Sequence, residues 1–99
     1  MSDIKNIKEF YNLDKNDWIE YAITTGFDKR IIEYIKHKPS QLIRIPNDND
    51  VICFPCPKNW QIVDTILKTY TDYAIIIPLI KGTIGSKATE KFIKYIKKI

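Results

Sequence analysis

The stretch CFPCPKNW at positions 53–60 combines residue types and spacings that suggest chemistry more than any other part of the chain. Cys53 and Cys56 form a C-x-x-C pair, which can perform thiol–disulfide exchange at the start of a helix or supply two ligands of a zinc site. The second half of the stretch instead suggests a helix that begins at a proline, presents Lys58 and buries Trp60. These two interpretations lead to different classes of protein.

The sequence around the cysteine pair favours neither redox chemistry nor zinc. A thioredoxin-like domain carries its C-x-x-C in a βαβ unit, whereas helical patterns precede and follow this pair. A structural zinc site needs four ligands, and the chain offers two cysteines and one histidine, His37, which falls in the last turn of an expected helix. We expect two reduced, inert cysteines and no metal site, and we keep a thiol redox protein as the third-ranked alternative.

The stretch GTIGSKAT at 82–89 looks like the end of a phosphate-binding loop but lacks its pattern. Such a loop needs G-x-x-x-x-G-K-[ST] after a buried strand, so that backbone amides wrap the phosphates. Here Ser86 separates Gly85 from Lys87, and the preceding segment has a helical pattern. We expect a helix break with Ser86 as the cap of the next helix. No serine, histidine and acid set with nucleophile spacing is visible either, so no catalytic residue is predicted.

Length and composition indicate one small globular domain. A chain of 99 residues with 44% hydrophobic and 28% charged residues can form one modest core. The longest apolar run, AIIIPLI at 74–80, is much shorter than the roughly 20 residues that cross a bilayer. Because the N-terminus also lacks the apolar run of a signal peptide, we expect a cytoplasmic protein without membrane contact.

Apolar residues at steps of three and four predict helices along most of the chain. Pro78 should kink the fifth helix or stop it early, and Gly82 and Gly85 should break the chain after it. The expected helices run from the cap Ser2 to about Asn12, from the cap Asn16 to Gly26, from the cap Asp28 to before Pro39, from Pro57 to about Tyr70, from Tyr73 to Lys81, and from the cap Ser86 to Ile99.

The segment 42–54 has a different pattern. LIRI and VICF flank the polar turn cluster PNDND at 46–50, so we expect a short β-hairpin or an irregular excursion there. The predicted fold class is therefore all-α, a small helical bundle with one such excursion.

Lys58 lies where local electrostatics would not place a cation. With Cys56 at the cap position and Pro57 at the first helical position, Lys58 falls in the first turn. A cation beside the positive end of a helix dipole costs roughly 0.3–1 kcal/mol when exposed. Lys58 is either a solvated lysine that tolerates this cost or a lysine placed to meet an anion together with the free amides of the turn. Spacing alone favours the solvated lysine.

The order of the motifs carries a family resemblance. DWIEYA, GFDKRIIEYI, PSQL, an acidic loop and FPCPKNWxxV follow one another between residues 17 and 63. This arrangement resembles the C-terminal helical lid of MoxR-like AAA+ ATPases, including phage-encoded ones. The likeness covers about residues 14–99; it is strongest over 14–70, above all at 54–63, and later rests mainly on the helix pattern. In that family F-P-[ST]-P-R-[ST]-W opens a lid helix, and its arginine, the sensor 2 residue, contacts the γ-phosphate of ATP.

The resemblance implies that Lys58 is the nucleotide-sensing residue and Trp60 the buried aromatic. Lysine in place of arginine keeps the charge but loses the planar fork that binds phosphate oxygens bidentately. Cys56 replaces the usual serine or threonine cap, at a cost of about 1 kcal/mol. The sequence contains neither a phosphate-binding loop nor paired acids for magnesium. We therefore expect it neither to bind ATP and magnesium on its own nor to hydrolyse ATP.

The resemblance thus implies that residues 1–99 are a single lid domain. Such a lid would pack over ATP and magnesium held by a separate α/β domain, sense the phosphates through Lys58 and contact neighbouring subunits of a ring. A small basic helical nucleic-acid-binding module is the alternative. It rests on residues 86–99, which hold five lysines, one acid and the interleaved aromatics Phe92 and Tyr95. An ordinary terminal helix with a solvated lysine face explains the same segment.

Overall fold

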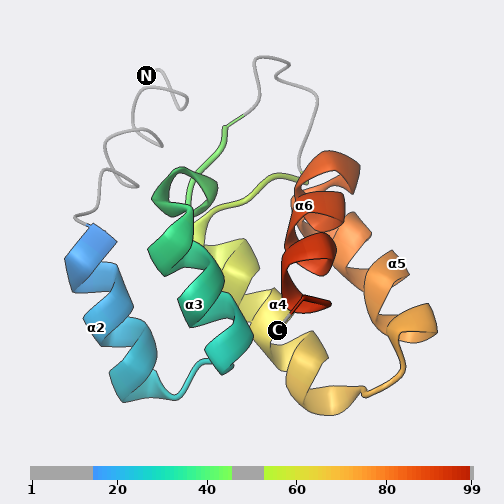
Figure 1. Cartoon of the computed structure of the whole chain (residues 1–99), viewed down its shortest axis with the longest axis horizontal. Helices are drawn as coiled ribbons and strands as arrows, with labels where there is room; N and C mark the ends of the chain where they lie inside the picture. The colour runs from blue at the N-terminus through green and yellow to red at the C-terminus, as the bar shows by residue number, and fades with distance from the viewer. Residues whose placement is uncertain (1–14, 46–52, 99) are drawn as a thin grey trace, which may run out of the picture.

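The computed structural model describes residues 15–45 and 53–98, and every regular element in these two ranges is a helix (Figure 1). The prediction of an all-α helical bundle is confirmed. The expected helix from Ser2 to Asn12 and the turn cluster at 46–50 lie outside the described residues. The elements are α2 (Lys15–Thr25), α3 (Lys29–His37), the short 3-10 helix η1 (Pro39–Gln41), α4 (Pro57–Thr69), α5 (Tyr73–Ile84) and α6 (Ser86–Ile96).

The helices expected from Asn16 to Gly26 and from Asp28 to before Pro39 are present as α2 and α3, and the two pack against each other as a hairpin. Gly26 ends α2 with a φ of 91°, a left-handed conformation that favours glycine. Asp28 caps α3, because its carboxylate accepts a hydrogen bond from the backbone N–H of Arg30 at 2.9 Å. Asn16, predicted as the cap, lies within α2 together with Lys15, the first described residue.

α5 is longer than predicted, since it continues through Pro78 and Gly82 to Ile84. A proline inside a helix costs about 3 kcal/mol and an internal glycine about 1 kcal/mol relative to alanine. The helix nevertheless persists because Ile76, Ile80 and Ile84, spaced four residues apart, are all at most 1% exposed. Burying each isoleucine gains about 1.5–3 kcal/mol, so the combined packing outweighs both penalties.

The junction between α5 and α6 corrects the role predicted for Ser86. Gly85, not Ser86, occupies the cap position, and Ser86 is the first residue of α6. Gly85 has a φ of 90° and ends α5 as well as capping α6. A Cβ added at Gly85 would lie 3.0 Å from the backbone oxygen of Cys53. The turn therefore requires glycine both for its backbone conformation and for this close approach.

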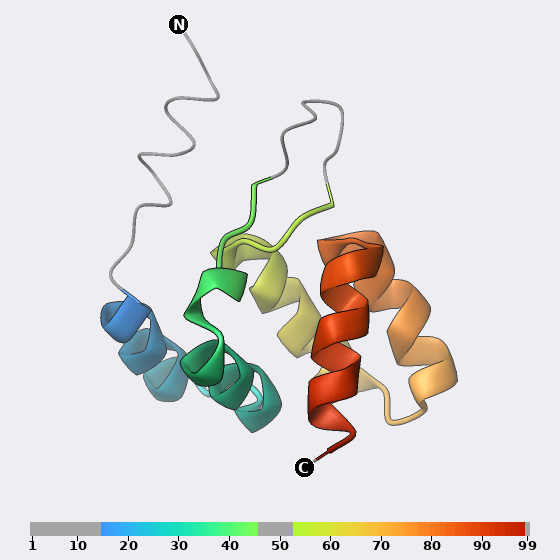
Figure 2. The ribbon, with the colours of Figure 1, turned by 45° about the horizontal axis from the view of Figure 1, so that its top comes forward.

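Three aromatic rings form the centre of the core. Tyr34 of α3, Trp60 of α4 and Phe92 of α6 are each 0% exposed, and their ring centroids lie 5.2–5.9 Å apart. Figures 1 and 2 show α3, α4 and α6 in the middle of the bundle, with α2 outside α3 and α5 outside α4 and α6. Buried residues from all five α-helices belong to one hydrophobic cluster. None of the helices in the described ranges is long and apolar enough to span a bilayer.

The predicted excursion is irregular in its described parts. Neither 42–45 nor 53–56 forms a strand, and the backbone hydrogen bond that joins them runs from the N–H of Arg44 to the oxygen of Pro55 at 2.9 Å. Pro55 has no N–H to return a hydrogen bond, so a ladder does not extend through it. Of the two predicted forms, the irregular one is therefore what the described residues adopt.

The hydroxyl of Tyr34 is buried without a hydrogen-bond partner among the described residues. An unsatisfied buried polar group costs about 1–3 kcal/mol, so Tyr34→Phe should raise the free energy of unfolding by about 1 kcal/mol. Burial raises the pKa of Tyr34 to about 12, above its value of 10.0 in an unfolded chain. The unfolded state therefore loses this proton first, and Tyr34 weakens the fold as the pH rises from about 10 to 12.

Urea denaturation of Tyr34→Phe at pH 7 and pH 11 tests both statements. The variant should be more stable at pH 7, and its advantage should be larger at pH 11. A variant that is less stable than the native protein would show that the hydroxyl contributes to the fold.

Candidate functional site

Lys58 lies exposed in the first turn of α4, as predicted. The first backbone N–H of α4 with an internal partner is that of Trp60, which donates to the oxygen of Cys56 at 2.9 Å. The N–H groups of Lys58 and Asn59 precede it and have no partner within the helix. Cys56 has an extended backbone and its side chain does not cap the helix. The start of α4 therefore presents one cation and two backbone donors, a combination that suits an anion.

The backbone beneath Lys58 is held firmly. The indole Nε1 of Trp60 donates a hydrogen bond to the backbone oxygen of Gln41 at 3.0 Å, which ties α4 to η1. The side-chain amide of Asn59 donates to the backbone oxygen of Phe54 at 2.8 Å, which fixes the chain entering the helix. The Lys58 side chain is thus exposed on a backbone whose position the core determines.

Both cysteines of the C-x-x-C pair are free. The thiol of Cys53 donates to the backbone oxygen of Gly82 at 3.0 Å, and Cys56 is 3% exposed. His37, the remaining candidate ligand, lies on α3, exposed, with its ring centroid 5.8 Å from that of Tyr95. In the described part of the chain, no three histidine, cysteine or acidic side chains are grouped so that they could hold a metal ion.

Replacing both cysteines by serine should leave the protein folded and change its stability by about 1 kcal/mol or less. A serine at position 56 is a better helix cap than cysteine, and the stability gained from capping offsets the cost of burying the serine hydroxyl. Thermal denaturation of Cys53→Ser/Cys56→Ser, with and without a reductant and a chelator, checks this result. A requirement for zinc, or a large gain in stability on oxidation of the native protein, would contradict it.

Residues of the turn between α2 and α3 form a polar cluster on α4 that the sequence did not reveal. Asp64, 7% exposed, accepts a hydrogen bond from the N–H of Asp28 at 2.7 Å and pairs with Lys68 at 3.0 Å. Lys68 also donates to the oxygen of Gly26 at 2.6 Å. Arg30 binds the carboxylate of Asp28 through two nitrogens at 2.9 Å and thereby lowers the pKa of Asp28. The sequence held one signal of this cluster. Asp64 lies four residues after the buried Trp60 and four residues before Lys68, a spacing that brings side chains together on a helix surface.

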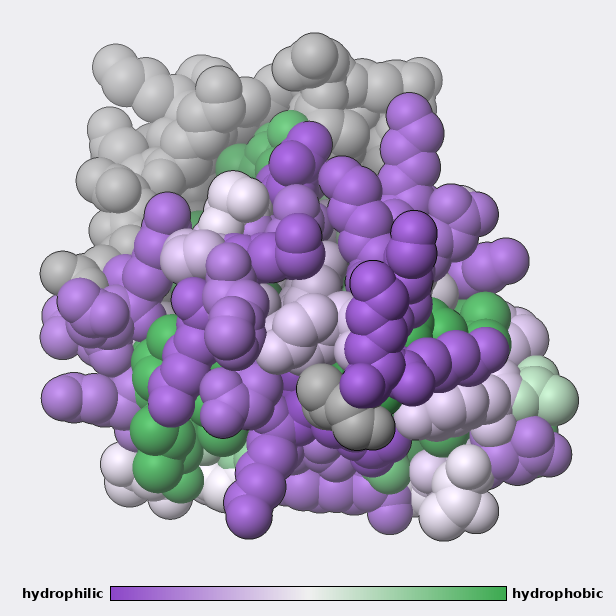
Figure 3. Space-filling view, in the orientation of Figure 1, coloured by the Kyte–Doolittle hydropathy of each residue, from purple (hydrophilic) through white to green (hydrophobic). Residues whose placement is uncertain are grey.

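The lysine face predicted for the C-terminal helix is present, and Figure 3 shows the hydrophilic surface on this side of the molecule. Lys87, Lys91, Lys94 and Lys98 are all exposed. The two interleaved aromatics point elsewhere: Phe92 is 0% exposed in the core, and Tyr95 packs against Tyr34 with centroids 5.3 Å apart. The aromatic part of the nucleic-acid pattern thus belongs to the core.

Lys58 and Trp60 both lie in the first turn of α4, and Cys53 and Cys56 lie in the segment that leads into this helix. Comparisons of the chain with known protein families, with curated proteins and with solved structures found no match.

Proposed function

We propose that this chain is the C-terminal lid domain of an AAA+ ATPase, with Lys58 at the sensor 2 position. The observation that supports the proposal is the start of α4, where an exposed lysine and two uncapped amides stand on a backbone fixed by the buried Trp60. A stretch of the form F-P-x-P-[RK]-x-W, which the resemblance places at a sensor helix, occupies this start.

In this proposal the nucleotide and its magnesium ion are held by a separate α/β domain, and the lid closes over the phosphates. Lys58 supplies a positive charge near the γ-phosphate, and the amides of the first turn of α4 add to the local positive potential. The state of the nucleotide then changes how the lid is held against its own domain and against the next subunit of a ring.

Measurements of ATP binding distinguish the contribution of the lid from that of the α/β domain. A single lysine and two amides replace neither the magnesium ion nor the loop that provides most phosphate affinity, so the isolated chain should bind ATP weakly. Calorimetric titration of the isolated chain, and then of the chain together with its α/β domain, tests this. The proposal predicts tight ATP binding only in the second case, with a loss of affinity or turnover in Lys58→Ala. The proposal would be contradicted if the chain associated with the α/β domain equally well with and without ATP, and equally well in the native and Lys58→Ala forms.

The exposed lysines of α6 favour a second candidate function, that of a nucleic-acid-binding module. Binding through lysines alone would be sequence-independent and would weaken steeply as salt increases. Fluorescence anisotropy with a single-stranded oligonucleotide at 20 mM and 200 mM salt, on the order of the range over which such contacts are lost, distinguishes the two functions. The lid proposal predicts no measurable binding, and tight low-salt binding favours the alternative.

A further inference from the structure

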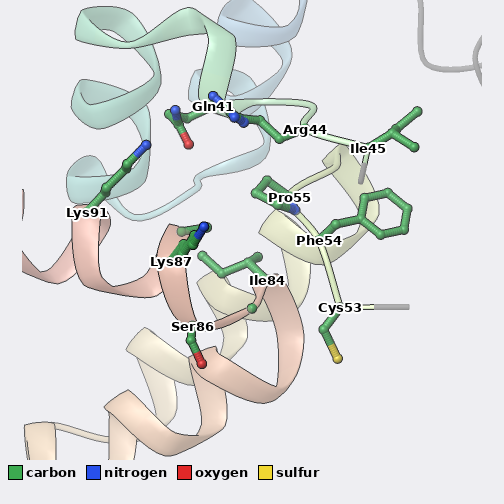
Figure 4. A pocket seen from close by; sticks show the side chains of 12 residues that line it. Gln41, Arg44, Ile45, Cys53, Phe54, Pro55, Ile84, Ser86, Lys87 and Lys91 are labelled. Atoms are coloured by element: carbon green, nitrogen blue, oxygen red, sulfur yellow. The ribbon is translucent and has the colours of Figure 1, made fainter. Parts of the chain in front are cut away.

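A pocket of about 540 Å³ opens between the segment that follows η1 and the start of α6 (Figure 4). Its wall comes from five places in the chain: the end of η1, the two segments on either side of residues 46–52, the end of α5 and the first turns of α6. Lys58 does not line it. The residues that carry the argument are Gln41, Arg44, Ile45, Phe54, Lys87 and Lys91.

Three cations line the pocket, and no acidic residue is among the described residues of its wall. Arg44 follows η1, and Lys87 and Lys91 lie one turn apart on α6. In Figure 4 their nitrogen ends lie around the same part of the pocket, beside the side chain of Gln41. Like charges held together in this way raise the local positive potential, and a bound anion would relieve their repulsion.

Gln41 is the strongest indication of a ligand. It is 6% exposed, and its backbone is fixed on both sides: its N–H donates to the oxygen of Lys38 at 2.9 Å, and its oxygen accepts from Trp60 at 3.0 Å. Its side-chain amide lies toward the pocket and has no hydrogen-bond partner among the described residues (Figure 4). An amide that lines a pocket can both donate a hydrogen bond to a group bound there and accept one from it.

The first turn of α6 completes the polar wall. Gly85, Ser86 and Lys87 all line the pocket, and the N–H of Gly85 donates to the oxygen of Lys81 at 3.1 Å. Within α6, the first N–H with a partner in the helix is that of Thr89, which donates to the oxygen of Gly85 at 3.0 Å. The cap residue is glycine, so no capping side chain occupies the N–H groups of Ser86, Lys87 and Ala88, which have no partner within the helix. This is the stretch GTIGSKAT, whose sequence lacks the pattern of a phosphate-binding loop but whose fold exposes glycine, amides and a lysine together.

We propose that this pocket binds the phosphate group of a small organic phosphate. Three cations, a side-chain amide and free helix amides match a doubly charged group with several acceptor oxygens, whereas a carboxylate would need only one of these cations. A lone phosphate ion is much smaller than the pocket. Ile45 and Phe54 lie on the remaining wall and would contact an apolar or aromatic body attached to the phosphate. The proposal rests on these residues alone and is independent of the lid function.

Titrations followed by NMR in a phosphate-free, low-salt buffer test the site, with inorganic phosphate and phenyl phosphate as probes. Both should shift the amide signals of residues 85–88, and phenyl phosphate should bind more tightly because its ring reaches Phe54. Arg44→Gln and Lys91→Gln should each weaken phenyl phosphate binding by roughly ten- to a hundredfold, the range for hydrogen bonds to charged groups. Lys94→Gln, which removes the same charge from an exposed position of α6 outside this pocket, should leave the affinity unchanged.

Gln41→Met distinguishes a binding role from a structural one. It removes an amide that has no described partner, so the denaturation midpoint should stay the same or rise, while the affinity for phenyl phosphate should fall several-fold. Three results would overturn the proposal: no binding of either probe, equal weakening by Lys94→Gln, or binding of a single-stranded oligonucleotide without binding of phenyl phosphate. The last result would assign the basic surface to nucleic acid.

Discussion

Lys58→Ala should lower ATP turnover by roughly a hundredfold when this chain acts with its α/β ATPase domain. Loss of a charge placed at developing negative charge typically costs on the order of 3 kcal/mol. The lysine is exposed in the first turn of α4 and contributes little packing, so the change should act on turnover without affecting the fold. Steady-state ATP hydrolysis by native and variant assemblies measures the effect.

Two further variants control this result. Lys58→Arg should keep or raise turnover, because a guanidinium binds phosphate oxygens through two parallel hydrogen bonds. Lys36→Ala removes an exposed lysine of α3 and should leave turnover unchanged. If Lys58→Ala hydrolyses ATP at the native rate, Lys58 is the solvated lysine that its spacing alone suggests.

Trp60→Ala should destabilise the domain by about 3–5 kcal/mol, a large part of the 5–15 kcal/mol that holds a typical domain together. The side chain is 0% exposed and packs against both Tyr34 and Phe92, so its removal leaves a cavity at the centre of the core. It also leaves the oxygen of Gln41 without its donor. Urea denaturation followed by circular dichroism measures the change, and the variant is expected to be partly or fully unfolded at 37 °C.

Trp60→Phe separates packing from hydrogen bonding. It keeps most of the apolar volume but not the indole N–H, so it should lose less stability than the alanine variant. Tyr70→Ala truncates an aromatic at the end of the same helix that is 40% exposed, and it should cost much less. A Trp60→Ala protein as stable as Tyr70→Ala would mean that Trp60 is not in the core.

The sequence was sufficient where local chemistry decides the structure. The cap at Asp28, the end of α2 at Gly26 and the start of α4 at Pro57 were all predicted, because each depends on one residue type at one position. The same local pattern placed Lys58 in an exposed first turn and Trp60 in the core.

Contacts between distant residues decided what the sequence did not predict. The helical state of Pro78 and Gly82 depends on three isoleucines that face the core, and the cap at Gly85 depends on the nearby oxygen of Cys53. The pocket brings Gln41 and Arg44 next to Lys87 and Lys91, more than forty positions later in the chain. No local periodicity indicates such a grouping, because it arises only when α6 packs on α3.

Reconstitution tests the proposed lid function most directly. The α/β ATPase domain is produced without its lid, and ATP turnover is measured before and after this chain is added in trans or joined to the domain. The account predicts that the native chain raises turnover strongly, that Lys58→Arg does the same, and that folded Lys58→Ala fails to do so. Equal turnover with and without the chain, or full restoration by Lys58→Ala, would contradict the account.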